Sequence, residues 1–336
     1  MKYTNYHIYD GGRNDMNIFQ KYLIIGIVAL FFIVSIAPTI ISKESEIFKN
    51  VKLTINGSNC NWIVDDEGDL GSFETIQEAI SVASDNQVIC VYSGNYSGEI
   101  VVNGLTGLQI IGIPFEYHSG NDSGKPKIDG QNIRHVFSIL ECDFLTIDGF
   151  EIFNSALVPD HGGLFLKDCK DCIIKNNTIK NNFYGIILKS SDYCAILSNL
   201  IDFHNYSGII LEQSDRNTIL YNHIHNSGYN GITLVDSCRN LIILNDFSYN
   251  IKDGIKIVPE KKPAIEFNKI YCNNIEFNGQ PCEQLLSFGN IWYANWWGEV
   301  ITIKRIRWTE NDPGEVPINC RLIIDPSPSK FRYYIP

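Results

Sequence analysis

The sequence predicts an all-β fold, a right-handed single-stranded parallel β-helix with about 23 residues in each coil. The first observation is a pattern of glycine, apolar, any residue, apolar, which begins at five evenly spaced glycines: Gly163, Gly185, Gly208, Gly231 and Gly254. The second is an asparagine that follows each pattern with the same spacing: Asn177, Asn199, Asn222, Asn245 and Asn268. Two independent markers therefore keep one register over this part of the chain.

Each repeated unit contains short strands rather than helices, because its apolar residues alternate with a period of two. A unit of this length cannot bury its own apolar face, so successive units are expected to stack and form a common core. Two inward columns follow from the register: Ile174, Ile196, Ile219, Ile242, Ile265 and Ile179, Ile201, Ile224, Phe247, Ile270. Ile210, between two inward positions of its strand, is predicted to face outward. The asparagine column is expected to form a ladder of side-chain hydrogen bonds at a bend.

Cysteines occupy a turn position of the same repeat. Cys172 and Cys194 stand where Asn217 and Asn240 stand in later coils. Packing of small side chains is one interpretation, and a disulfide between neighbouring coils is another. Metal or redox chemistry is a third, although the lone C-x-x-C formed by Cys169 and Cys172 is a weak zinc signal.

The chain divides into five predicted segments. Residues 1–21 form a cytoplasmic or signal n-region, 22–42 a transmembrane anchor or signal peptide, and 43–59 a linker. The β-helix extends over 60–288, and an aromatic and proline-containing capping segment over 289–336. Apolar residues at helical spacing predict an amphipathic helix over 72–83, capped by Ser72, which covers the first coil.

Charge excludes one class of partner. Against 27 basic residues the chain has 38 acidic ones, for a net charge of −11, and no basic stripe is present. Nucleic-acid binding is therefore not expected. A membrane is the expected partner of the N-terminal apolar segment, with the rest of the chain on the cell surface, or secreted if that segment is cleaved.

Several stretches resemble the pectin-lyase-like β-helix proteins, and in particular the NosD-like, periplasmic copper-binding subgroup. They are WIVDD at 62–66, TIQEAI at 75–80, VYSGNY at 91–96, LTIDGF at 145–150, NIWYANWW at 290–297 and the five coils. The resemblance covers about residues 60–336. It implies the fold, but the superfamily contains lyases, epimerases, hydrolases and binding proteins, so it does not assign a chemistry.

No recognisable catalytic constellation is present, so enzymatic activity stays open. The G-H-G turn and R-x-K pair of polygalacturonases are missing, as is the calcium cage of pectate lyases. Pro159, Asp160 and His161 are similar to the D-P-H-D signature of mannuronan epimerases, but the order is permuted and Gly162 replaces the second aspartate.

A column of aromatic side chains is the candidate substrate-binding surface. Phe183, Tyr206 and Tyr229 stand one coil apart at one turn, and Asp160 and His161 precede them. Stacked rings along the axis could contact the faces of sugar rings. The alternative interpretation is a ladder that only rigidifies the turn.

A second group consists of residue types that commonly act as metal ligands. Asp202, His204, His223 and His225 lie close in the predicted register, and imidazoles beside a carboxylate suit a divalent transition metal. Solvated surface histidines are the alternative. No other cofactor is identified.

Three functional hypotheses follow. The first is a cell-surface protein that binds polysaccharide or envelope components along a rigid β-helix. The second is a carbohydrate-active enzyme, namely a polysaccharide lyase, epimerase or hydrolase. The third is metal handling connected with copper, which the resemblance implies. Copper(I) prefers sulfur ligands, but both methionines precede the repeats.

Overall fold

The computed structural model describes residues 60–68, 71–115, 117, 122–259, 264–265, 267–284, 287–288, 290–293 and 295. The chain separates into two compact units, Met1–Ser58 and Asn59–Pro336, and the first lies outside the described residues. The predicted n-region, apolar segment and linker (1–59) therefore lie outside them, as does most of the predicted capping segment. Within the described part of the chain, no helix is both long and apolar enough to span a membrane.

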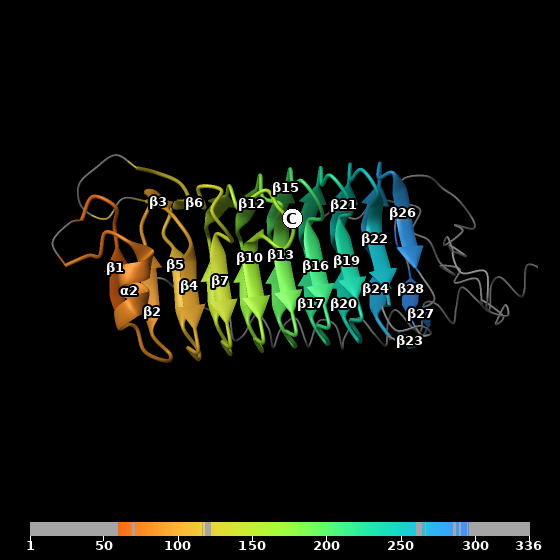
Figure 1. Cartoon of the computed structure of the whole chain (residues 1–336), viewed down its shortest axis with the longest axis horizontal. Helices are drawn as coiled ribbons and strands as arrows, with labels where there is room; N and C mark the ends of the chain where they lie inside the picture. The colour runs from red at the N-terminus through yellow and green to blue at the C-terminus, as the bar shows by residue number, and fades with distance from the viewer. Residues whose placement is uncertain are drawn as a thin grey trace, which may run out of the picture. The chain divides into compact units, whose positions relative to one another are not determined.

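The described residues of the second unit form a parallel β-helix with three long sheets and one two-stranded sheet (Figure 1). Each coil from β2 to β26 contributes one short strand to each long sheet, whereas β1 and β28 add strands to one sheet only, and every pairing between named strands is parallel. A right-handed coil is the connection that twisted parallel strands favour. The predicted fold class is thus confirmed for the β-helix.

The strands are grouped by sheet. Sheet A contains β1 (Trp62–Val64), β2 (Val88–Val91), β5 (Gln109–Gly112), β8 (Thr146–Asp148), β11 (Ile173–Lys175), β14 (Ala195–Leu197), β17 (Thr218–Leu220), β20 (Leu241–Ile243), β24 (Lys269–Tyr271) and β28 (Ile291–Tyr293). Sheet B contains β3 (Asn95–Ser97), β6 (Lys127–Asp129), β9 (Glu151–Phe153), β12 (Thr178–Lys180), β15 (Leu200–Asp202), β18 (His223–His225), β21 (Asp246–Ser248) and β25 (Asn274–Glu276). Sheet C contains β4 (Ile100–Asn103), β7 (Phe137–Leu140), β10 (Gly162–Lys167), β13 (Tyr184–Lys189), β16 (Ile209–Glu212), β19 (Ile232–Val235), β22 (Asp253–Val258) and β26 (Gln280–Gln284). The two-stranded sheet pairs β23 (Ala264–Ile265) with β27 (Ser287–Phe288).

The core fills the inside of the coils with stacked aliphatic side chains. Ile174, Ile196, Ile219 and Ile242 are in register on sheet A, and all four are 0% exposed. Ile179, Ile201, Ile224 and Phe247 form the matching column on sheet B. Each side chain therefore packs on the column members of the coils before and after it, as the sequence predicts.

Asparagine side chains connect successive coils at the bend between sheets A and B. The Oδ1 of Asn222 accepts from the backbone N–H of Asn199 at 2.9 Å, and Asn245 accepts from Asn222 at 2.9 Å. The Nδ2 of Asn222 donates to the Ile196 carbonyl at 2.8 Å. The ladder satisfies backbone groups that a buried bend would otherwise leave unpaired.

The prediction for the last coil is wrong by five residues. Asn245 bonds Asn273, 28 positions later, rather than Asn268, because this coil contains an insertion that includes β23. Asn268 belongs to a second ladder, where it accepts from the N–H of Asn240. The two apolar columns shift in the same way, since Ile242 pairs with Ile270 and Phe247 with Ile275, whereas Ile265 pairs with Phe288 of β27.

The covering helix is shorter than predicted. It is α2 (Ile76–Val82), and its N-cap is Thr75 rather than Ser72. Thr75 and Glu78 form a capping box, in which each side chain accepts from the backbone N–H of the other. Ile76, Ala79 and Ile80 are buried against the first coils.

The cysteines have two structural roles. Cys172 and Cys194 are buried free thiols, and Cys194 donates its backbone N–H to Asn217 Oδ1, so the packing interpretation is confirmed. Burial raises the pKa of the neighbouring Cys142 thiol to about 11, which keeps it protonated at neutral pH. Cys60, which precedes β1, forms a disulfide with Cys90 of β2, and the repeat pattern gave no indication of this pair.

Candidate functional site

The outer face of sheet C carries a pocket of about 280 Å³. Leu164, Leu166, Ile186 and Leu188 point into the core, so the residues between them point outward. Two adjoining turns complete the wall. The lining residues are His135, Asp160, His161, Phe165, Tyr184, Ile187, Lys189, Ile210 and Glu212.

Apolar side chains make the floor of this pocket. Phe165, Ile187 and Ile210 are in register on three successive coils. Ile187 is 4% exposed and Ile210 is 7% exposed, although both lie on the outer face. Ile210 is therefore outward, as predicted, but not solvated, because the side chains of the pocket cover it. His135 stacks on Phe165 with a centroid distance of 4.3 Å and an interplanar angle of 5°.

Polar groups surround the floor. Lys189 Nζ pairs with Glu212 Oε2 at 3.1 Å across neighbouring coils. His135 Nδ1 accepts from the backbone N–H of Gly162 at 3.1 Å. Burial, followed by the nearby His161 and Arg134, lowers the pKa of His135 to about 4, so this imidazole is neutral at pH 7.

His161 and Tyr184 have fixed hydrogen-bonding roles in the pocket. His161 Nδ1 lies 3.0 Å from the carbonyl oxygen of Pro159, which can only accept, so Nδ1 carries the proton and Nε2 keeps its lone pair in the neutral ring. Burial raises the pKa of Tyr184, and the neighbouring Tyr206 and Asp160 add to the effect. Tyr184 is therefore a hydroxyl donor at neutral pH.

The predicted aromatic column lies beside this pocket. Phe183 and Tyr206 stack at 5.7 Å with an angle of 5°, and Tyr206 and Tyr229 stack at 4.3 Å with an angle of 15°. Both faces of Tyr206 are consequently covered, whereas Phe183 and Tyr229 each stack on Tyr206 with one face. The ring of Tyr184 is steeply inclined to those of Phe183 and Tyr206, with centroid distances of 5.0 Å and 5.3 Å, and Tyr184 also lines the pocket. The column and the pocket are thus one continuous surface.

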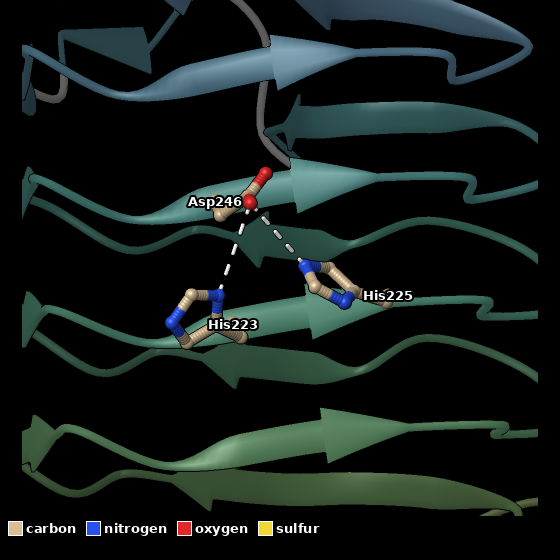
Figure 2. Close-up of side chains that lie close together, drawn as sticks. All are labelled: His223, His225 and Asp246. Atoms are coloured by element: carbon tan, nitrogen blue, oxygen red, sulfur yellow. Dashed lines mark ion pairs between the residues drawn. The ribbon is translucent and has the colours of Figure 1, made fainter. Parts of the chain in front are cut away.

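The structure brings together two of the four predicted metal residues, His223 and His225. His223 and His225 lie near Asp246 on the outer face of sheet B, and their ligand atoms are all within 4.8 Å of one another (Figure 2). His204 is 2% exposed and lies in a turn, where Nε2 contacts the Ile179 carbonyl at 3.1 Å. Asp202 accepts from Asn226 Nδ2 at 2.8 Å and is not part of the three-residue group.

Several residues of these sites were missed from the sequence. Asp246 is in register with His223, one coil later, so the 23-residue spacing could have identified it. Phe165, Tyr184, Lys189 and Glu212 carried no signal beyond outward positions on their strands.

The fold and these surfaces define a parallel β-helix protein whose candidate sites lie on the outer faces of its sheets. The family model described as periplasmic copper-binding protein (NosD) matches residues 79–296. The match covers more than half of the chain, so the chain belongs to this family. No curated protein sequence matches the chain.

Several solved structures are similar to this one. The complex of XylC with xylose has a TM-score of 0.53 at 13% identity, covering 70% of this chain and 65% of that chain. A double mutant of the periplasmic alginate epimerase AlgG has a TM-score of 0.47 at 13% identity, covering 66% of this chain and 53% of AlgG. DFA-IIIase from Arthrobacter chlorophenolicus A6, in complex with GF2, has a TM-score of 0.49 at 11% identity, covering 70% and 88%. At these identities the similarity concerns the fold.

Proposed function

We propose that this chain is an extracytoplasmic protein that binds a neutral polysaccharide on the outer face of sheet C. One observation carries the proposal. Tyr184 connects a pocket that has an apolar floor and a polar rim to a column of stacked aromatic rings, so that the two form one surface. Saccharide sites combine these two elements, since sugar C–H faces pack on apolar rings while the hydroxyls need hydrogen-bonding groups around them.

The pocket supplies both kinds of contact. Phe165, Ile187 and Ile210 form an apolar floor over three coils, of which the half-buried Phe165 is the part most open to a ligand. Tyr184 offers a hydroxyl, and the ion pair of Lys189 and Glu212 offers donors and acceptors together. Because the floor lies on rigid strands, little side-chain ordering opposes binding.

Charge favours a neutral ligand over a polyanion. The pocket is lined by the acidic Asp160 and Glu212, the basic Lys189 and two histidines, of which His135 is neutral at pH 7. The whole chain has a net charge of −11. A polyuronate would be repelled by both the pocket and the surrounding field.

The aromatic column forms a wall of the site rather than a set of free ring faces. The faces of Tyr206 are covered by Phe183 and Tyr229, so a ligand reaches ring edges and hydroxyls there. The column keeps Tyr184 in place and extends the surface along the axis of the β-helix, which suits a linear chain.

Two observations support an extracytoplasmic location. The Cys60–Cys90 disulfide is a bond typical of oxidising compartments. The family model that matches the chain is described as that of a periplasmic protein. Anchoring through residues 22–42 stays a prediction about residues outside the described part of the chain.

A glycan array with the full chain, followed by calorimetric titration of each hit, tests the proposal. The double variant Lys189→Ala with Tyr184→Phe is expected to weaken binding at least tenfold, about 1.4 kcal/mol. Lys167→Ala is the matched control, because Lys167 is in register with Lys189 one coil earlier but does not line the pocket. Equal affinities for both variants, or binding restricted to polyanions, would contradict the proposal.

The column needs a separate variant. Tyr206→Ala combined with Tyr229→Ala is expected to lower the melting temperature, because two ring stacks are lost. A tenfold loss of affinity with an unchanged melting temperature would instead locate the ligand on the column itself.

Glycoside hydrolysis is the second candidate, because two carboxyl groups, Asp160 and Glu212, line the same pocket. Glycosidases use such a pair as acid and as base or nucleophile. Release of reducing ends from a bound polysaccharide, abolished in Glu212→Gln, is the expected result. Binding with no product after prolonged incubation favours the binding protein.

A further inference from the structure

We propose that His223, His225 and Asp246 form a binding site for a borderline divalent transition-metal ion, such as Zn²⁺ or Cu²⁺, on the outer face of sheet B. The site lies on a different sheet from the saccharide pocket and does not depend on the proposed function. Figure 2 shows the two imidazoles and the carboxylate pointing toward one another from neighbouring coils.

The backbone brings the three side chains together without a special loop. His223 and His225 are two positions apart on β18, and Ile224 between them is 0% exposed in the core. Residues at this spacing on a strand point to the same side, so both imidazoles face outward. Asp246 is the register partner of His223 on β21, and its neighbour Phe247 also points inward. The ligand positions are thus fixed by strand pairing.

The distances fit a shared ion better than direct hydrogen bonds. His225 Nε2 lies 3.5 Å and His223 Nδ1 lies 3.8 Å from the same oxygen, Oδ2 of Asp246. Hydrogen bonds between such atoms are about 2.7–3.2 Å long. Two ligands bound at about 2.1 Å in a tetrahedral site are about 3.4 Å apart. Both distances to Asp246 Oδ2 are therefore within about 0.4 Å of this tetrahedral separation, and the three ligand atoms all lie within 4.8 Å of one another.

Burial adds a reason for a cation at this position. The Asp246 side chain is 3% exposed, while those of His223 and His225 are 31% and 23% exposed. A carboxylate held so far from water is stabilised by a nearby positive charge, which the imidazoles supply only when protonated. A divalent ion supplies it with neutral imidazoles, and the partly exposed histidines leave it a path from solvent.

The ligand set selects the class of metal. Two imidazole nitrogens with one carboxylate oxygen suit Zn²⁺, Cu²⁺ and Ni²⁺, whereas Ca²⁺ and Mg²⁺ require mainly oxygen ligands. The group contains no thiolate or thioether, so it does not suit Cu⁺. Three protein ligands leave at least one position for water or an external ligand, as in exchangeable rather than closed structural sites.

Calorimetric titration of the full chain with Zn²⁺, after removal of bound metals by a chelator, tests the site. We expect one equivalent to bind with micromolar or tighter affinity. His223→Gln and His225→Gln are each expected to weaken binding at least tenfold, and Asp246→Asn as well. His204→Asn is the matched control, because His204 is a buried histidine of the preceding coil whose Nε2 contacts the Ile179 carbonyl, and we expect it to bind as the parent chain does.

Electron paramagnetic resonance with one equivalent of Cu²⁺ gives a second readout that does not depend on affinity. Coupling to two nitrogens is expected in the parent chain and to one in either histidine variant. Circular dichroism checks that the variants fold. If Asp246→Asn does not fold, the variants of the partly exposed His223 and His225 decide the question. Absence of stoichiometric binding by the parent chain, or equal affinities in the parent and both histidine variants, would overturn the proposal.

Discussion

His204 makes the stability of the β-helix depend on pH in a way that one substitution should remove. The side chain is 2% exposed, its Nδ1 accepts from the Asn182 N–H at 3.3 Å, and its Nε2 contacts the Ile179 carbonyl at 3.1 Å. Burial lowers its pKa from 6.5 to about 4. Above pH 6.5 the ring is neutral in both states and its contribution is complete. As the pH falls toward 4, the unfolded chain binds a proton that the folded chain does not, and stability is lost.

The expected loss follows from these two pKa values. Between pH 7 and pH 4.5 it amounts to about 2.5 kcal/mol. The turn position of His204 is held by Asn182 one coil earlier and by Asn250 two coils later, where the amide accepts from a backbone N–H and donates to a carbonyl. An asparagine at position 204 could form the same bonds without titrating. His204→Asn should therefore keep most of the stability at pH 7 and lose about 2.5 kcal/mol less than the parent chain at pH 4.5.

Urea unfolding at both pH values, followed by circular dichroism, measures this difference. Other titrating groups contribute equally to both chains and cancel in the comparison. Asn205→Ala, which changes the exposed neighbour, should retain the pH dependence of the parent chain. The reasoning fails if His204→Asn and the parent chain lose the same free energy of unfolding on acidification.

Three further predictions concern the ladders, the core and the first coil. Asn222→Ala removes five side-chain hydrogen bonds within the buried ladder and should lower the free energy of unfolding, measured in urea, by about 3–5 kcal/mol. The exposed Asn205→Ala should lower it by less than about 0.5 kcal/mol. Similar values for the two variants would contradict the role of the ladder. Ile219→Ala, at a fully buried core position, should cost about 2–5 kcal/mol, and a cost below about 1 kcal/mol would show that the inward column is misassigned. Cys60→Ser with Cys90→Ser removes the disulfide that closes a 30-residue separation, and should lower the free energy of unfolding by about 3–4 kcal/mol. Thiol titration first establishes that the parent chain holds the disulfide. An unchanged midpoint of urea unfolding in the variant would then contradict this loop-closure argument.

The sequence predicts the regular coils well because each repeat position is under a separate physical demand. Ile219 recurs one coil later as Ile242 because both fill the same apolar interior, and Asn222 recurs as Asn245 because both satisfy the same bend. Where an insertion lengthens a coil, the period alone fails, and Asn268 is consequently placed in the wrong ladder. The correct partner, Asn273, can be identified only when strand pairing sets the register.

The candidate sites were less predictable because they depend on contacts between coils. Asp160 and His161, which the sequence suggests as ligand-binding residues, line the pocket. For the floor residue Phe165, the only signal in the sequence is its outward position in an alternating strand. The stacking of Tyr206 on Tyr229 also depends on side-chain angles that a repeat pattern does not contain.

The marker glycines explain why the repeat is so visible and why it says little about function. A Cβ atom at Gly208 would lie 2.8 Å from the carbonyl oxygen of Gly231, and one at Gly231 would lie 2.6 Å from that of Gly254. Any side chain in this column would push successive coils apart, so glycine recurs for steric reasons alone. Selection for ligands is therefore free to act only at outward positions, where successive coils differ, as Leu200, His223 and Asp246 do in one column of sheet B. The register that the glycines and asparagines maintain then determines which of these outward residues become neighbours, as it does for His223 and Asp246.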